Sequence, residues 1–177
     1  MKFKLALRKK CLEKRNFFSK KIGNDCLKEI DINLIISEIK SKLKISSIAI
    51  YYPTKSEISP LKLIKICKNL SIKICLPIID KNNNELIFSE FDNEKSLKKN
   101  KFGIYEPINI NKIIPDIVFV PMVGFDKNLN RLGYGKGYYD RYLKKHSKLR
   151  KKIITVGVAF SFQKHNNLPI NKKDFKL

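Results

Sequence analysis

Apolar residues in this chain follow two alternating patterns, one with helical spacing and one in short continuous runs. Residues 2–22 and 26–43 have apolar side chains three or four positions apart, which predicts two amphipathic helices. In the second helix the expected buried face comprises Leu27, Ile30, Leu34, Ile35 and Ile39. The next segment, residues 45–52 (ISSIAIYY), is short, β-branched and followed by Pro53, which predicts the first strand.

The same alternation continues to the end of the chain. Ser59-Pro60 fits a helix cap followed by proline at the first helical position, so a helix is expected from there to about Asn69. Strands are predicted over residues 71–79, 85–91, 116–123 and 153–160, with a long loop over 92–114 and a helix over 138–149. Strands alternating with helices predict a single three-layer α/β/α domain over residues 1–177, with a mostly parallel, Rossmann-like sheet.

The basic charge of the chain has a compositional origin. The formal net charge is +22, but 33 of the 38 basic residues are Lys and only five are Arg. Lys, Ile and Asn dominate the whole chain, as codons rich in A and T would produce, and Arg-rich clusters with interleaved aromatic residues are missing. No specific nucleic-acid partner is therefore expected. The longest apolar runs are too short for a membrane span or a signal peptide, so we expect a cytoplasmic location. We also expect a monomer.

Cysteine and histidine do not indicate a metal site. The four cysteines show no C-x-x-C spacing, and His146 and His165 have no ligand-like partners nearby in sequence, so zinc is not expected. Cys67 and Cys75 lie in or beside apolar runs and are expected to be small core residues.

The segment from Gly124 to Leu143, GFDKNLNRLGYGKGYYDRYL, differs from the rest of the chain. Four of the seven glycines lie within it, and it joins the carboxyl end of the most apolar strand to a helix. Ligands bind at that edge of an open α/β sheet. Alternate glycines allow consecutive N–H groups to form an anion-binding concavity, and a helix starting near Gly137 adds its positive end. Lys136 and Arg131 supply charge for phosphates, and Asp140 is placed to hold Mg²⁺.

Other phosphate and cation motifs fail on spacing. A Walker loop needs glycine six positions before Lys136 and a hydroxyl residue after it, but Asn130 and Gly137 occupy those positions. An EF-hand starting at Asp126 needs glycine where Arg131 stands. The alternative to a nucleotide site is an ordinary glycine-rich turn, with Lys136 solvated and Asp140 a simple helix N-terminal acid.

The segment from Pro121 to Leu143 closely resembles the signature of the 5-formyltetrahydrofolate cyclo-ligase family, also called 5,10-methenyltetrahydrofolate synthetases. Weaker matches are K-x-x-L-R-K at residues 4–9, S-E-I at 56–58 and L-P-I-x-x-x-D at 168–174, in the family's order. The resemblance implies an ATP- and Mg²⁺-dependent ligase that closes 5-formyltetrahydrofolate to 5,10-methenyltetrahydrofolate, giving ADP and phosphate through phosphorylation of the formyl oxygen.

The resemblance also assigns roles to residues by matching position. The catalytic residues would be Arg131, Lys136 and Tyr138. ATP would contact Lys4, Arg8, Arg131, Leu132, Gly133, Tyr134, Gly135, Lys136, Gly137, Tyr138 and Tyr139. Folate would contact Tyr52, Glu57, Tyr134, Gly135, Lys136, Gly137 and Tyr138. The metal ligands would be Asp140 and Asp174. Simpler alternatives exist for some of these: Lys4 and Arg8 as two of many cations, Glu57 as a cap for the following helix, and Tyr52 as core.

One departure from the family bears on activity. The family continues beyond the position of Asp174 into a further acidic residue and a short final strand, whereas this sequence stops at Leu177. A carboxylate that helps the metal is thus expected to be missing, and weak magnesium binding would follow. The alternatives to a working enzyme are a folate-binding protein with little or no turnover and a basic RNA-associated protein.

Overall fold

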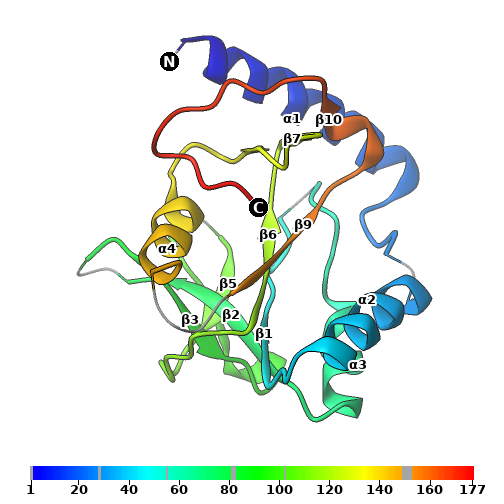
Figure 1. Ribbon diagram of the computed structural model, residues 1–177, viewed down its shortest axis with the longest axis vertical. Helices are drawn as coiled ribbons and strands as arrows, with labels where there is room; N and C mark the ends of the chain where they lie inside the picture. The colour runs from blue at the N-terminus through cyan, green and yellow to red at the C-terminus, as the bar shows by residue number, and fades with distance from the viewer. Residues whose placement is uncertain (1, 28, 55, 81–82, 102, 149–152) are drawn as a thin grey trace.

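A five-stranded sheet in the order β3-β2-β1-β6-β9 forms the centre of the protein (Figure 1). The computed structural model describes residues 2–27, 29–54, 56–80, 83–101, 103–148 and 153–177. The strands are β1 (Ser47–Ala49), β2 (Lys73–Ile79), β3 (Leu86–Glu90), β6 (Ile117–Pro121) and β9 (Ile154–Val158). Neighbouring strands are parallel except β2 and β3, which are antiparallel at one edge. The prediction of a mostly parallel α/β sheet is therefore confirmed.

Helices cover both faces of the sheet because side chains alternate along its strands. Ile48 and Ile117 lie in the core shared with α2 (Glu29–Lys42) and α3 (Lys62–Asn69). Ala49 and Val118, each one residue further on, lie in the opposite core under α4 (Tyr138–His146). Figure 1 shows α4 on one side of the sheet and α2 with α3 on the other. Cys67 and Cys75 are fully buried, as expected, one in each core.

The first helix, α1 (Lys2–Ile22), lies across the top of the sheet in Figure 1, beside a second, smaller sheet. That sheet has the order β10-β7-β8 and consists of β7 (Gly124–Asp126), β8 (Arg131–Leu132) and β10 (Lys164–His165). A small core of Cys11, Val123, Leu132 and Leu168 joins α1 to it. The position of α1 matters for function because it covers the end of the sheet where the chain leaves β6.

Several sequence predictions were wrong in detail. Residues 92–114 are not a plain loop: they contain a 3₁₀ turn (Glu94–Ser96), β4 (Leu97–Lys99) and β5 (Tyr105–Pro107). The short strands β7, β8 and β10 were also not predicted, because two- and three-residue strands leave almost no periodic pattern. The helix expected from Pro60 begins at Lys62, and residue 149 at the expected end of α4 lies outside the described residues.

The expected buried face of α2 was partly wrong. Ile32 and Ile36 are buried, whereas Leu34 and Ile35 are 63% and 43% exposed. Apolar residues occupy so many positions of this helix that periodicity alone does not fix which side faces the core; packing against α3 decides it. The side chain of Ile30 lies outside the described ones.

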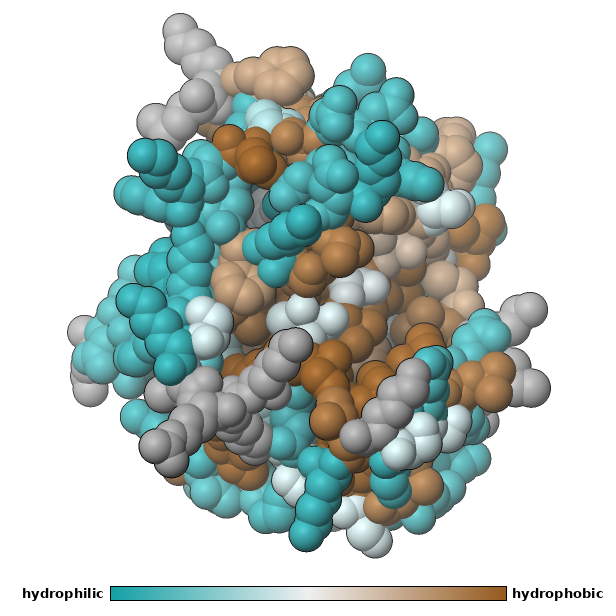
Figure 2. Space-filling model, viewed as in Figure 1, coloured by the Kyte–Doolittle hydropathy of each residue, from teal (hydrophilic) through white to brown (hydrophobic). Residues whose placement is uncertain are grey.

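The surface is largely hydrophilic but not uniformly so. In Figure 2 apolar residues gather in the middle of the visible face, below α1, and hydrophilic residues surround them. Within the described ranges, no helix combines the length and the apolar character that crossing a membrane requires.

Candidate active site

The candidate residues meet at the carboxyl ends of β1 and β6. From β1 the chain runs to β2 on one side of the sheet and later returns to β6 on the other side. Such a reversal opens a crevice in which α/β proteins bind ligands. The segment after β1 carries Tyr52 and Glu57, and the segment after β8 carries the glycines. These two segments touch, because the hydroxyl group of Tyr134 donates a hydrogen bond to Oε1 of Glu57.

Glu57 is a buried carboxylate that accepts several hydrogen bonds. The residue is only 6% exposed. Its Oε2 accepts hydrogen bonds from the backbone N–H and the hydroxyl of Thr54, both at 2.7 Å. These donors precede Glu57 and none belongs to α3, so Glu57 does not cap the following helix. Although the residue as a whole is 43% exposed, desolvation at the hydroxyl, with the Glu57 carboxylate alongside, raises the pKa of Tyr134, and Tyr134 therefore stays protonated and donating at neutral pH.

The glycine segment from Gly133 to Gly137 packs directly under α1. Nε of Arg8 donates to the carbonyl oxygen of Gly133 at 2.7 Å. Gly135 has φ +97°, and a Cβ there would lie 3.3 Å from Cζ of Arg8. Gly137, with φ +67°, caps α4, which begins at Tyr138 as the sequence predicted. The backbone conformation at Gly135 favours glycine, and an added Cβ would also crowd the Arg8 guanidinium.

Two ion pairs bring the candidate metal ligands to the same edge. Nη2 of Arg131 lies 2.6 Å from Oδ1 of Asp140, which also accepts the backbone N–H of Phe175 at 3.1 Å. Nζ of Lys4 lies 2.5 Å from Oδ2 of Asp174. Because Phe175 directly follows Asp174, the two acids lie in adjoining pieces of chain. The ordinary helix-acid interpretation of Asp140 does not account for these contacts.

The donor set fits magnesium better than a metal with an all-protein cage. No group of three or more His, Cys, Asp or Glu side chains suited to a metal occurs among the described residues. Oδ2 of Asp140 and Oδ1 of Asp174 accept no hydrogen bond from any residue in the described ranges. Mg²⁺ in nucleotide sites usually takes one or two carboxylates together with phosphate and water oxygens. Two carboxylates with one free oxygen each meet that requirement.

Other candidates keep unused hydrogen-bonding groups. Lys136 is exposed, and its ammonium forms no ion pair within the described part of the chain. Nε of Arg131 and the hydroxyl of Tyr139 are buried and also lack a partner there. Buried unpaired groups cost about 1–3 kcal/mol each, so these are available to a ligand. Leu132 is fully buried, and so only its backbone can serve ATP.

Tyr138 is the candidate that the structure places least favourably. Its hydroxyl donates to Oδ1 of Asn84 at 2.9 Å, in the turn between β2 and β3. Its ring lies 5.0 Å from the Arg141 guanidinium. The structure therefore does not bring Tyr138 into the group of side chains around Glu57.

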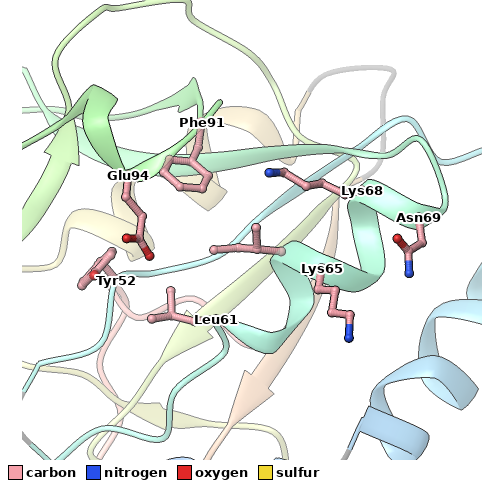
Figure 3. A pocket seen from close by; sticks show the side chains of 8 residues that line it. Tyr52, Leu61, Lys65, Lys68, Asn69, Phe91 and Glu94 are labelled. Atoms are coloured by element: carbon pink, nitrogen blue, oxygen red, sulfur yellow. The ribbon is translucent and has the colours of Figure 1, made fainter.

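Tyr52 lines a pocket and is not simply core. Its ring centroid lies 4.8 Å from that of Tyr105. The pocket has a volume of about 400 Å³ and is bordered by Tyr52, Leu61, Ile64, Lys65, Lys68, Asn69, Phe91 and Glu94. In Figure 3 the ammonium of Lys68 extends across the pocket toward Phe91, whereas Lys65 points away and Glu94 lies near Tyr52. The space thus has an apolar middle and polar ends.

Arg15 is the residue that sequence reasoning missed. It is 4% exposed, and its guanidinium donates to Oγ of Ser56 at 3.1 Å and to the carbonyl oxygen of Met122 at 3.2 Å. Its Cζ also lies 5.5 Å from the ring centroid of Tyr134. The available signal was spacing, because Lys4, Arg8 and Arg15 fall on one face of a helix.

Comparisons with known proteins identify the family to which the chain is similar. The family model for the 5-formyltetrahydrofolate cyclo-ligase family matches residues 1–177. The Haemophilus influenzae 5-formyltetrahydrofolate cyclo-ligase is 36% identical over 137 residues, covering 74% of this chain and 72% of its own. The Mycoplasma pneumoniae 5-formyltetrahydrofolate cyclo-ligase is 35% identical over 162 residues, covering 91% and 87%.

Two solved structures share the fold. The NMR structure of Aquifex aeolicus 5,10-methenyltetrahydrofolate synthetase has a TM-score of 0.69 at 33% identity, covering 98% of this chain and 86% of its own. The 5,10-methenyltetrahydrofolate synthetase from Mycoplasma pneumoniae has a TM-score of 0.68 at 28% identity, covering 98% and 94%.

Proposed function

The chain belongs to the 5-formyltetrahydrofolate cyclo-ligase family, and we propose that it converts 5-formyltetrahydrofolate and ATP to 5,10-methenyltetrahydrofolate, ADP and phosphate. The observation that supports this most directly is the hydrogen bond from Tyr134 to Glu57. It joins the glycine segment, expected to hold the nucleotide, to the segment after β1, expected to hold the folate. Two substrates bound on those segments would meet at this point.

The reaction needs the formyl oxygen to become a leaving group. In the proposed sequence this oxygen attacks the γ-phosphorus of ATP and ADP leaves. N10 of the folate then attacks the formyl carbon and loses its proton, and the bond from that carbon to oxygen breaks as the oxygen departs with inorganic phosphate, which takes up the proton. Phosphoryl transfer depends mainly on alignment and charge neutralisation, and the residues at this edge supply cations and backbone donors for both.

The nucleotide is assigned to the edge where α1 meets the glycine segment. Lys4, Arg8 and Arg131 bring positive charge to this edge, and the side chain of Lys136 is free to turn toward the phosphates. Arg8 is already held against Gly133, so little side-chain freedom remains to be lost when ATP binds. Lys4 would exchange Asp174 for phosphate oxygens.

Asp140 and Asp174 are assigned to magnesium. Magnesium held by these two carboxylates would supply charge that neutralises the transferred phosphoryl group. Arg131 holds Asp140 in place through Nη2, and Phe175 N–H holds the same oxygen. The oxygen that faces away from both stays available to the ion.

The folate is assigned to Glu57, Tyr134 and the pocket beside Tyr52. Glu57 provides an acceptor for the pterin N–H groups, and Tyr52 with Phe91 provides aromatic surface for the p-aminobenzoyl ring. The ammonium of Lys68, which extends across the pocket toward Phe91, would bind the carboxylates of the glutamate tail. We expect the enzyme to act in the cytoplasm as a monomer.

The test is product formation from 5-formyltetrahydrofolate and Mg-ATP, followed by the absorbance of methenyl-folate and by ADP release. We expect one ADP for each methenyl-folate. Lys136→Ala should raise the KM for ATP by about tenfold, the loss expected for one charge-assisted contact. Lys127→Ala, an exposed lysine in the β7–β8 turn, is the control with the same change in charge. Binding of both ligands without product would identify a folate-binding protein instead.

A further inference from the structure

Arg15 connects the folate side and the nucleotide side of the site, although it is not among the residues expected to contact either ligand. Its Nε donates to Ser56, the residue before Glu57, and its Nη1 donates to the carbonyl of Met122 at the end of β6. Its guanidinium also lies 5.5 Å from the ring of Tyr134. One side chain therefore contacts the segment after β1, the end of β6 and the glycine segment.

Burying the charged guanidinium of Arg15 costs free energy that hydrogen bonds or an opposite charge must offset. Arg15 is 4% exposed, and no acidic side chain forms an ion pair with it within the described residues. A charge taken out of water is unfavourable unless hydrogen bonds or an opposite charge compensate it. Glu57, which accepts a hydrogen bond from Tyr134, is buried as well, and it directly follows Ser56, to which Arg15 donates.

The two chain segments that Arg15 contacts, at Ser56 and at Met122, also bind other residues. The hydroxyl of Ser56 donates a hydrogen bond to Oδ1 of Asn16 at 2.5 Å. Ser56 is therefore bound to two adjacent residues of α1, Arg15 and Asn16. Met122 is held from the other side by Nε2 of Gln163 at 3.1 Å. Arg15 is thus the point at which α1 fixes the distance between the end of β6 and the loop that carries Glu57.

On the basis of the proposed function, we propose that Arg15 is a positioning residue that sets Glu57 and Tyr134 for binding of the folate. Arg15 lies eleven residues after Lys4, or about 16 Å along α1 at 1.5 Å per residue. One face of α1 therefore serves the phosphates near its start and the folate side further along. Substitution of Arg15 should affect the folate and leave the nucleotide largely unaffected.

Arg15→Met tests this, with Lys14→Met as the matched control. Lys14 is the preceding residue on the same helix, is exposed, and has its ammonium over the ring of Phe162. We expect Arg15→Met to raise both the KM and the dissociation constant for 5-formyltetrahydrofolate by about tenfold, as expected for a lost charged hydrogen bond. The KM for ATP should stay within about twofold, and Lys14→Met should leave both unchanged.

A merely structural role is separated by a double-mutant cycle. If Arg15 acts through Tyr134 and Glu57, its effect on folate binding should largely disappear in a Tyr134→Phe background. Arg15→Lys should restore only part of the affinity, because an ammonium cannot span both acceptors as a guanidinium does. Ser56→Ala removes one acceptor and supplies the same test if Arg15→Met does not fold.

The outcomes separate this inference from the proposed function. Normal product formation by the wild type with unchanged folate binding in Arg15→Met or Ser56→Ala would overturn the role of Arg15 alone. Equal losses for ATP and folate, or additive effects with Tyr134→Phe, would also overturn it. A wild-type protein that neither binds nor converts 5-formyltetrahydrofolate would instead overturn the proposed function.

Discussion

Gly135→Ala should weaken ATP binding through the side chain of Arg8. Gly135 has φ +97°, and an added Cβ would lie 3.3 Å from Cζ and 3.4 Å from Nη1 of Arg8. The backbone conformation alone costs an L-residue about 1–3 kcal/mol, which lowers the melting temperature by about 2–10 °C in a domain of this size. The methyl group also crowds the guanidinium that donates to Gly133 at 2.7 Å, so that the guanidinium must shift by a few tenths of an ångström.

Complete loss of the Arg8 contact would remove about 1.5–3 kcal/mol of interaction with phosphate oxygens, and a shift of this size removes part of that energy. We therefore expect a rise of about three- to tenfold in the KM for ATP. The assay is methenyl-folate formation at saturating 5-formyltetrahydrofolate with varied ATP, together with thermal unfolding of the same samples.

Gly23→Ala is the matched control. Gly23 also has a positive φ, +72°, but a Cβ there would meet nothing within 4 Å. It should lose similar stability and keep its KM for ATP. An unchanged KM for ATP in Gly135→Ala, with the expected loss of stability, would show that the Arg8–glycine contact does not belong to the nucleotide site.

Two further predictions concern the acidic residues. Asp140→Asn should raise the Mg²⁺ concentration for half-maximal activity by about tenfold. Asp174→Asn should raise it by less, because Asp174 also neutralises Lys4. Titration of MgCl₂ at fixed ATP measures both effects, and equal Mg²⁺ requirements in wild type and both variants would exclude the assignment. Burial opposes ionisation of Asp126, but hydrogen bonds from the Asn130 side chain and from the backbone N–H groups of Leu168, Asn130 and Asn128 outweigh it and lower its pKa. Its ionised form therefore stabilises the fold above the unfolded-state pKa of about 3.9, and that contribution is lost as the pH falls toward the folded value. Urea unfolding should show Asp126→Asn less stable than wild type at pH 7 and closer to it near pH 3.5; a difference independent of pH would refute this.

The parts of the fold with strong periodicity could be predicted from the sequence. The buried strand at residues 116–123 and the opening of α4 at Gly137 were predicted because continuous apolar runs and glycine caps are local signals. The β4–β5 hairpin and the small sheet were not, because strands of two or three residues are fixed by contacts distant in sequence. The grouping of Lys4 with Asp174 likewise depends on the folded chain.

Arg15 shows why the site was only partly predictable. Among 38 basic residues, a single cation on a helix carries little information. The choice of Arg over Lys carries more. Four of the five arginines are described, and each donates to a backbone carbonyl beside the site: Arg8 to Gly133, Arg15 to Met122, Arg131 to Pro121 and Arg141 to Lys136. A planar fork that binds two acceptors has no lysine equivalent, and so the rare residue marks the place where geometry matters.

The pair between Lys4 and Asp174 joins positions 170 residues apart. Contacts between residues this far apart in sequence form late and slow folding. Until α1 docks, its apolar side is uncovered. We therefore expect α1 and the segment around Asp174 to come together in the last steps of folding.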